Sequence, residues 1–106
     1  MPDRSHDDAM AEFYREDPEF ALGLLNEILE DGAQQELLVM LRQMTLAFGG
    51  VRAVAARAHL NPTQIYRTLS AAGNPSLSTL SAILKVMGLR IAVQPITRRM
   101  TKARAR

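Results

Sequence analysis

The sequence predicts an all-α fold, a bundle of five to six helices that ends in one short β-strand. Three observations support this prediction. Apolar residues recur at intervals of three and four along most of the chain, which is the period of an amphipathic helix. Glycine and proline residues divide these periodic stretches into short segments. Near the C-terminus, residues 90–94 alternate between large apolar side chains and small or polar ones, a pattern that favours a strand.

Three helices are expected in the N-terminal half of the chain. The first covers residues 6–16. Asp17 and Pro18 mark the start of the second, since Asp is a favoured N-cap and Pro fits the first helical position. We expect this helix to end at Gly32, in the position after the last turn where glycine is common, and the third helix to cover residues 33–48. The second helix carries two neighbouring apolar stripes, formed by Phe20, Leu24 and Ile28 and by Leu22, Leu25 and Leu29.

Residues 51–70 predict two short helices joined by a tight break. Small side chains in the first helix allow the second to approach closely. Asn61 is suited to cap the second helix, and Pro62 to begin it. Ile65 and Leu69, four residues apart, are expected to point inward on one face. The outward face then consists of Thr63, Gln64, Arg67 and Ser70.

This outward face has the chemistry of a helix that reads the major groove of DNA. Gln64 can pair with adenine through two hydrogen bonds, and Arg67 can pair with guanine in the same way. The same pattern also fits an ordinary helical hairpin whose polar face is simply solvated. Tyr66 lies on the flank of the helix, and we expect it to pack into the core rather than to reach DNA.

The last predicted helix follows a loop over residues 71–75. Ser76 caps this helix and Gly88 ends it. The predicted strand, Arg90 to Gln94, comes next and is stopped by a proline. Because one strand cannot form a sheet alone, we expect it to pair with its copy in a second subunit or with the N-terminal region. The core stripe of the helix is expected to be Leu77, Leu80, Ile83, Leu84 and Met87.

The charges are strongly segregated along the chain. All eleven acidic residues lie between Asp3 and Glu36, where two arginines oppose them, a net charge of −9. From Leu37 to Arg106 there are eleven Lys and Arg residues and no acid, a net charge of +11. A surface that lies against phosphates explains this basic half. The alternative is that the basic half docks on the acidic half of its own chain or of a partner.

Composition excludes several classes of function. The chain contains no cysteine, so disulfides, thiolate zinc sites and thiol nucleophiles are ruled out. Its two histidines, His6 and His59, lack metal-ligand spacing, and neither forms a catalytic constellation with a nucleophile. We therefore expect no enzyme activity, no metal and no cofactor, and no small-molecule ligand is evident. No apolar run approaches the length of a membrane span and the N-terminus is acidic, so we expect a cytoplasmic protein.

The motifs of residues 49–93 resemble those of the Cro-like (XRE) helix-turn-helix repressors and, more specifically, those of the HigA-like addiction-module antidote antitoxins. The resemblance rests on GGVRAVAARAHLNPTQIYRTLS and on GNPSLSTLSAILKVMGLRIAV. It implies a helical DNA-binding domain, usually dimeric. It also implies repression of an operon that encodes a RelE- or ParE-like toxin, and neutralisation of that toxin by direct binding. The family usually has glycine at the helix-turn-helix corner, whereas His59 stands there and must adopt the left-handed region.

The resemblance also implies roles for individual residues. Contacts to DNA bases are expected from Thr63, Gln64 and Arg67. Contacts to phosphates are expected from Arg52, Asn61, Ser70, Asn74 and Ser76. The dimer interface is expected to contain Leu89, Ile91 and Val93. The chain is then one compact domain with three parts: acidic helices over residues 1–48, a DNA-binding part over residues 49–95 and a flexible basic tail over residues 96–106.

Two other functions remain open from the sequence. The chain could be a stand-alone helix-turn-helix regulator with no toxin partner. It could also be an interaction module that neutralises a toxin without binding an operator. RelE-like toxins are usually basic, so the acidic half could dock one electrostatically.

Overall fold

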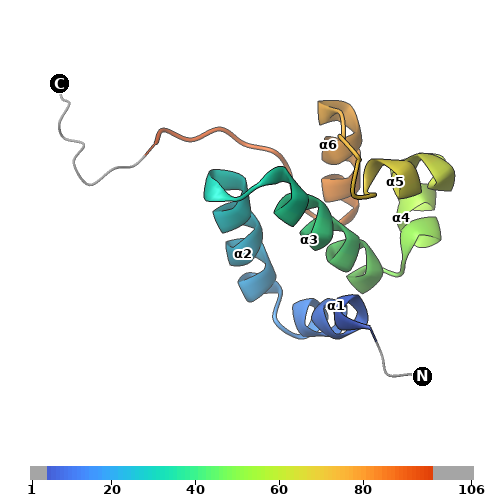
Figure 1. The fold of residues 1–106 in the computed structure, drawn as a ribbon, viewed down its shortest axis with the longest axis horizontal. Coiled ribbons are helices and arrows are strands. Elements are labelled where there is room, and N and C mark those ends of the chain that lie inside the picture. The colour runs from blue at the N-terminus through green and yellow to red at the C-terminus, as the bar shows by residue number, and fades with distance from the viewer. Residues whose placement is uncertain (1–4, 97–106) are drawn as a thin grey trace.

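The computed structural model describes residues 5–96, so the predicted basic tail lies almost entirely outside the described residues. These residues form six helices (Figure 1), and the all-helical prediction is confirmed for this part of the chain. The helices are α1 (His6–Glu16), α2 (Pro18–Asp31), α3 (Gln34–Ala47), α4 (Val51–Ala58), α5 (Pro62–Thr68) and α6 (Leu77–Val86).

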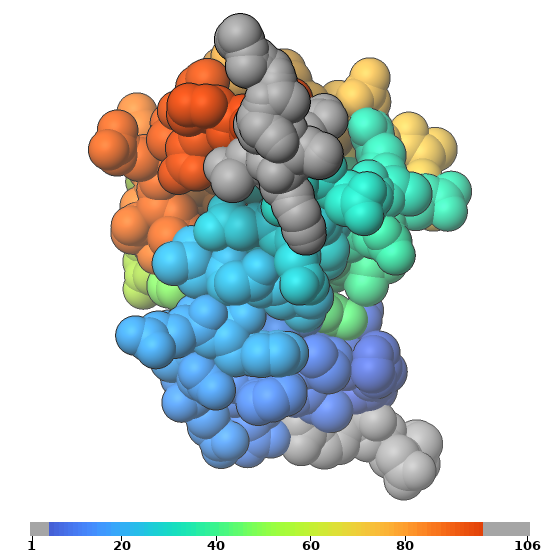
Figure 2. Space-filling view, turned by 90° about the vertical axis from the view of Figure 1, so that its left-hand side faces the viewer, coloured from blue at the N-terminus to red at the C-terminus, as the bar shows by residue number. Residues whose placement is uncertain are grey.

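Helix α3 lies at the centre of the molecule. The first two helices pack on it from one side and on each other, while α4 joins it to a second group in which α4 packs against both α5 and α6. Neither α1 nor α2 packs against α4, α5 or α6. Figure 2 shows α1 and α2 together on the face seen from the left-hand side of Figure 1, below residues 89–96. The acidic helices α1 and α2 and the helices α4, α5 and α6, which contain no acid, thus occupy different sides of α3.

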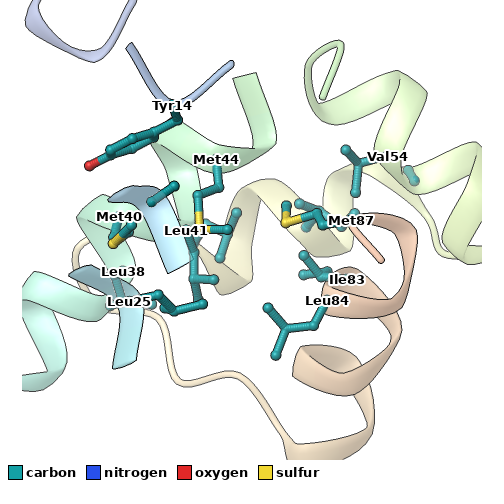
Figure 3. Packing of buried hydrophobic residues seen from close by; sticks show 14 residues of the cluster. Tyr14, Leu25, Leu38, Met40, Leu41, Met44, Val54, Ile83, Leu84 and Met87 are labelled. Atoms are coloured by element: carbon teal, nitrogen blue, oxygen red, sulfur yellow. The ribbon is translucent and has the colours of Figure 1, made fainter. Parts of the chain in front are cut away.

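One hydrophobic core connects the two groups of helices. Figure 3 shows Leu41 and Met44 of α3 between Tyr14 and Leu25 on one side and Val54, Ile83 and Met87 on the other. The side chains of Leu41, Val54 and Ile83 are completely buried. Burial of side chains of this size contributes about 1.5–3 kcal/mol each to folding. The two halves therefore fold around a shared helix rather than as separate domains.

Three helices end in the same backbone motif. After α3, α4 and α6, an amide two or three residues beyond the helix donates to a carbonyl five residues earlier, as in Leu60 N to Ala55 O at 2.9 Å. The motif needs a left-handed residue, which is Gly49 after α3 and Gly88 after α6. After α4 this residue is His59, with φ 59° and ψ 42°. The predicted left-handed corner is confirmed, and histidine tolerates it better than most side chains do.

Gly32 follows α2 for a different reason from the predicted left-handed conformation. Gly32 has φ −90° and is not left-handed. It is required for space, because a Cβ atom there would lie 2.9 Å from the Ile28 carbonyl oxygen and 2.6 Å from Glu36 Oε1. Glu36 accepts a hydrogen bond from Ala33 N at 3.0 Å and so caps the start of α3. The tight passage between α2 and α3 explains the glycine.

The predicted C-terminal strand is not present in the described part of the chain. Residues 89–96 are extended and carry neither helix nor strand. A strand requires a hydrogen-bonded neighbour, and within residues 5–96 no other segment is extended beside this one. Residues 6–16 of the N-terminal region form α1, so they do not supply the partner strand that was the other expectation.

Several side chains predicted to be buried are exposed. Tyr66 is 62% exposed and Leu77 is 71% exposed, so neither belongs to the core. On α2, the buried residues are Ala21 and Leu25, flanked by the half-buried Leu24 and Ile28. The remaining large apolar residues of both predicted stripes stay accessible: Phe20, Leu22 and Leu29. Because α2 contacts only α1 and α3, these two helices cover only part of its apolar side chains.

A polar connection fixes α1 on α3. The Tyr14 hydroxyl donates to Gln43 Oε1 at 2.9 Å, and Gln43 Nε2 donates to Asp7 Oδ1 at 3.1 Å. Gln43 is buried, so both ends of its amide need these partners. Burial, and then the negative charge of Asp7, raise the pKa of Tyr14 above its usual value of 10.0.

Residues 5–96 contain neither a helix of membrane-spanning length nor a cluster of metal ligands. No single helix in this range is long and apolar enough to cross a membrane, and the one adjacent pair with sufficient length and composition, α3 and α4, is bent by 89°. The same residues contain no group of three or more His, Cys, Asp or Glu side chains that could hold a metal ion.

We predict that Tyr14→Phe lowers the free energy of unfolding by about 1–3 kcal/mol, because it leaves Gln43 Oε1 buried without a donor. The raised Tyr14 pKa means that the wild-type protein also loses stability as the pH rises above 10.0, since unfolding then favours the phenolate. The variant should lack this loss. Denaturant unfolding at several pH values measures both effects. Tyr66→Phe removes an exposed hydroxyl and is the control; an equal effect of the two variants would contradict the prediction.

Candidate nucleic-acid interface

Helix α5 is a short helix held by caps at both ends. Asn61 Oδ1 accepts a hydrogen bond from Thr63 N at 2.8 Å, and Pro62 occupies the first helical position. Ile65 is completely buried and Leu69 nearly so, which confirms the predicted inward face. With this face against the core, Thr63, Gln64 and Arg67 are exposed to solvent, as predicted. The sequence reasoning therefore placed these three side chains correctly on the outside of α5.

Helix α3 positions α5 through a contact that the sequence did not reveal. Arg42 donates from Nη1 to the Leu69 carbonyl oxygen at 2.6 Å, at the end of α5. A cation is favoured there, because the C-terminal end of a helix carries partial negative charge. Arg42 is half-buried and lies 27 residues before its acceptor. No local pattern connects residues so far apart, so the sequence alone does not predict this contact.

The loop between α5 and α6 is also fixed from α3. Gln34, in the first turn of α3, donates to the Gly73 carbonyl oxygen at 3.3 Å and to Asn74 Oδ1 at 3.2 Å. Gly73 N in turn donates to the Ser70 carbonyl oxygen at 2.8 Å. These bonds leave the Asn74 amide nitrogen as its free donor, so a phosphate contact from Asn74 would use this group.

Two of the predicted phosphate-contacting hydroxyls are occupied within the chain. Ser70 Oγ donates to the Arg67 carbonyl oxygen at 2.8 Å. Ser76 Oγ accepts from Thr79 N at 3.1 Å and lies 3.0 Å from Thr79 Oγ1, to which it donates. Each hydroxyl has one proton, so their direct role is to cap α5 and α6. A phosphate contact at this position would therefore use backbone N–H groups at the start of α6 and not the Ser76 side chain.

The exposed charges around α5 are all positive. Arg52 on α4 and Arg67 on α5 are exposed, and α4, α5 and α6 contain no acidic residue. Two further cations, Arg57 and Lys85, line a shallow groove of about 440 Å³ between α4 and α6, together with His59. The structure thus places Arg52, Arg57, Arg67 and Lys85 on the group of helices that contains α5. This is the electrostatic environment that attracts a polyanion.

The three predicted dimer residues are in different environments. Leu89 is half-buried and packs against the core of its own chain. Ile91 is 39% exposed and Val93 is 95% exposed. Any interface formed by this segment would therefore be built mainly on Ile91 and Val93.

A sequence model of a family described as probable addiction module antidote protein matches residues 6–95, which includes all six helices. No curated protein and no solved structure matches the chain significantly.

We predict that Gly73→Ala strongly destabilises the protein, because a Cβ atom at this position would overlap the carbonyl of Thr68 at the end of α5. Overpacking of this kind costs about 1–3 kcal/mol or more. Gly23→Ala is the matched control: nothing lies within 4 Å of a Cβ there, and alanine should stabilise the interior of α2 by about 0.5–1 kcal/mol. Thermal unfolding of both variants checks the prediction, which would be wrong if they shifted the midpoint in the same direction.

Proposed function

The chain belongs to the family of probable addiction module antidote proteins, and from this premise we propose that it is an antitoxin that binds DNA through α5 and represses its own operon. The role of antidote follows from the family, which is not a family of enzymes. DNA binding, the type of toxin and the assembly are the parts that we propose.

The observation that carries the DNA-binding proposal is the outward face of α5. Thr63, Gln64 and Arg67 are exposed on a helix that is anchored by Ile65 and Leu69 and fixed at its end by Arg42. A rigid short helix with exposed Gln and Arg side chains suits hydrogen bonding to base edges in the major groove. The absence of acids in α4, α5 and α6 supports approach to phosphates. An ordinary helical hairpin with a solvated polar face would not require acidic residues to be absent.

We propose that the partner is a basic toxin of the RelE or ParE type. The acidic residues support this proposal, because they are concentrated on α1 and α2, away from α5. Opposite charges accelerate association and orient the partners. The chain would then neutralise the toxin with its N-terminal half and bind DNA with the remainder.

We also propose that the chain acts as a homodimer. One helix-turn-helix reads a few base pairs, and two-fold dimers gain specificity by spanning half-sites about 34 Å apart. The extended residues 89–96 leave Ile91 and Val93 exposed, two residues apart and therefore on the same side of an extended chain. Contact between two such segments would cover both side chains.

We predict that Gln64→Ala and Arg67→Ala each cost about 1–3 kcal/mol of discrimination between the promoter of the operon and random DNA. Both side chains are exposed, so the fold should be retained. Fluorescence anisotropy with promoter and random duplexes measures the difference. Equal weakening on the two duplexes would show that these residues contact only phosphates.

The salt dependence of the same binding reaction is the accompanying control. Each phosphate contact should add about 0.9 to the slope of log K against log salt. Arg52→Ala should lower this slope while leaving discrimination unchanged. If the wild-type protein had no affinity for its promoter at low salt, the operator-binding part of the proposal would fail and the toxin-binding alternative would remain.

We predict that Val93→Asp gives monomers with much weaker promoter binding, because it places a charge in the proposed contact between two segments. Ala92→Asp introduces the same charge at the neighbouring exposed position, on the other side of the extended chain, and should have a smaller effect. Analytical ultracentrifugation at micromolar concentration measures assembly. A wild-type monomer with undiminished promoter affinity would contradict the dimer proposal.

A further inference from the structure

One side of α2 has no partner within the described part of the chain. Leu22 is 43% exposed and Leu29 is 52% exposed. Seven residues separate them, so they lie on one stripe of the helix, two turns apart. Exposed apolar side chains are ordinary when scattered, but a group of them marks an interaction surface.

An aromatic pair lies on the other flank of α2, toward α1, because Phe20 and Leu22 are two residues apart and do not share a side of the helix. The rings of Phe13 and Phe20 are stacked with their centroids 4.8 Å apart, and each side chain remains more than 40% exposed. Phe20 also lies against Tyr14, with 6.4 Å between ring centroids. The pair closes the turn between the two helices. Only part of its apolar area is covered by the chain itself.

A groove lies next to Leu22. It has a volume of about 310 Å³ and is lined mainly by apolar side chains, including Tyr14, Leu22, Met44 and Phe48. Phe13 and Phe20 do not line this groove. We call Leu22, Leu29 and Phe48, with the groove beside them, the α1–α2 face. A groove of this size admits one or two side chains of a partner.

The charges beside the α1–α2 face are acidic. Glu16, Glu19, Glu27 and Glu30 are all exposed on α1 and α2. Glu19 stands three residues before Leu22, on the same side of the helix. Arg15 lines the groove, but its guanidinium donates to the carbonyl oxygens of Leu46 and Ala47 at 3.3 Å and thus caps the end of α3.

The acidic charges indicate which kind of partner binds the α1–α2 face. A second copy of the chain that docked through the same face would bring two acidic surfaces together, and DNA would be repelled. A basic protein that presents apolar side chains among its cations meets both requirements of the surface. We infer that the α1–α2 face is the surface that binds the toxin, with apolar side chains of the toxin in the groove and its cations against the glutamates. This inference rests on the proposed toxin partner.

The position of the α1–α2 face adds a consequence. Helices α1 and α2 contact α3 but none of α4, α5 and α6, and Figure 1 shows them on the opposite side of α3 from α5. Toxin on this face therefore leaves α5 accessible. One chain can hold the toxin and the promoter at the same time.

The test uses the full chain and the purified toxin encoded in the same operon. Leu22→Asp and Leu29→Asp should each weaken toxin binding about tenfold or more, as expected for central contacts of an interface. Leu77→Asp is the matched control, because Leu77 is a 71% exposed leucine on α6, outside the face; it should leave toxin affinity unchanged. Isothermal titration calorimetry gives the affinities. Promoter binding by Leu22→Asp and Leu29→Asp, measured in parallel, should equal that of the wild type and verifies their folding.

Each outcome has a defined meaning. Toxin binding that is unchanged in both face variants would overturn the inference while leaving the proposed antitoxin function intact. No binding of the toxin by the wild-type chain would instead contradict the toxin partner itself. If Leu22→Asp or Leu29→Asp converted a dimer into a monomer, the face would be an interface between copies of the chain, and the inference would be wrong. Wild-type chain saturated with toxin should still bind the promoter; loss of promoter binding would refute simultaneous occupancy.

Discussion

The burial of α3 between two groups of helices is the constraint on which the structure depends. Leu41 and Met44 fill the space between α1 and α2 on one side and α4 and α6 on the other. Polar residues of α3 also position these helices: Gln43 accepts a hydrogen bond from α1, and Arg42 donates one to the end of α5. A 14-residue helix thus supplies both the core and the positioning contacts of the two surfaces. A shift of α3 would displace the acidic and the basic surface together.

The sequence was most informative where local chemistry decides the structure. Capping residues such as Asp17, Asn61 and Ser76 predicted helix starts correctly, since each side-chain oxygen satisfies an amide a few residues away. The left-handed corner at His59 was predictable for the same reason. The outward face of α5 followed from the four-residue spacing of Ile65 and Leu69.

Sequence reasoning failed where the number of packing partners decides the structure. Leu22 and Leu77 have helical spacing, yet no element covers them. Residues 90–94 alternate like a strand, but a strand also needs a neighbour. The contacts of Arg42 and Gln34 span 27 and 39 or more residues, so only the folded chain reveals that they position α5 and its following loop. The phosphate contacts expected from Ser70 and Ser76 stay predictions, and the folded chain adds that both hydroxyls already form hydrogen bonds at helix ends.

The separation of acidic and basic helices across α3 gives the molecule an electric dipole moment. In the field of a DNA duplex such a molecule experiences a torque as well as an attraction: the end that carries Arg52 and Arg67 is drawn in while the end that carries Glu19 and Glu30 is pushed away. Many collisions with the wrong orientation would therefore be corrected before contact. The small net charge of the chain, +2, conceals this effect, because orientation depends on where the charges lie and not on their sum.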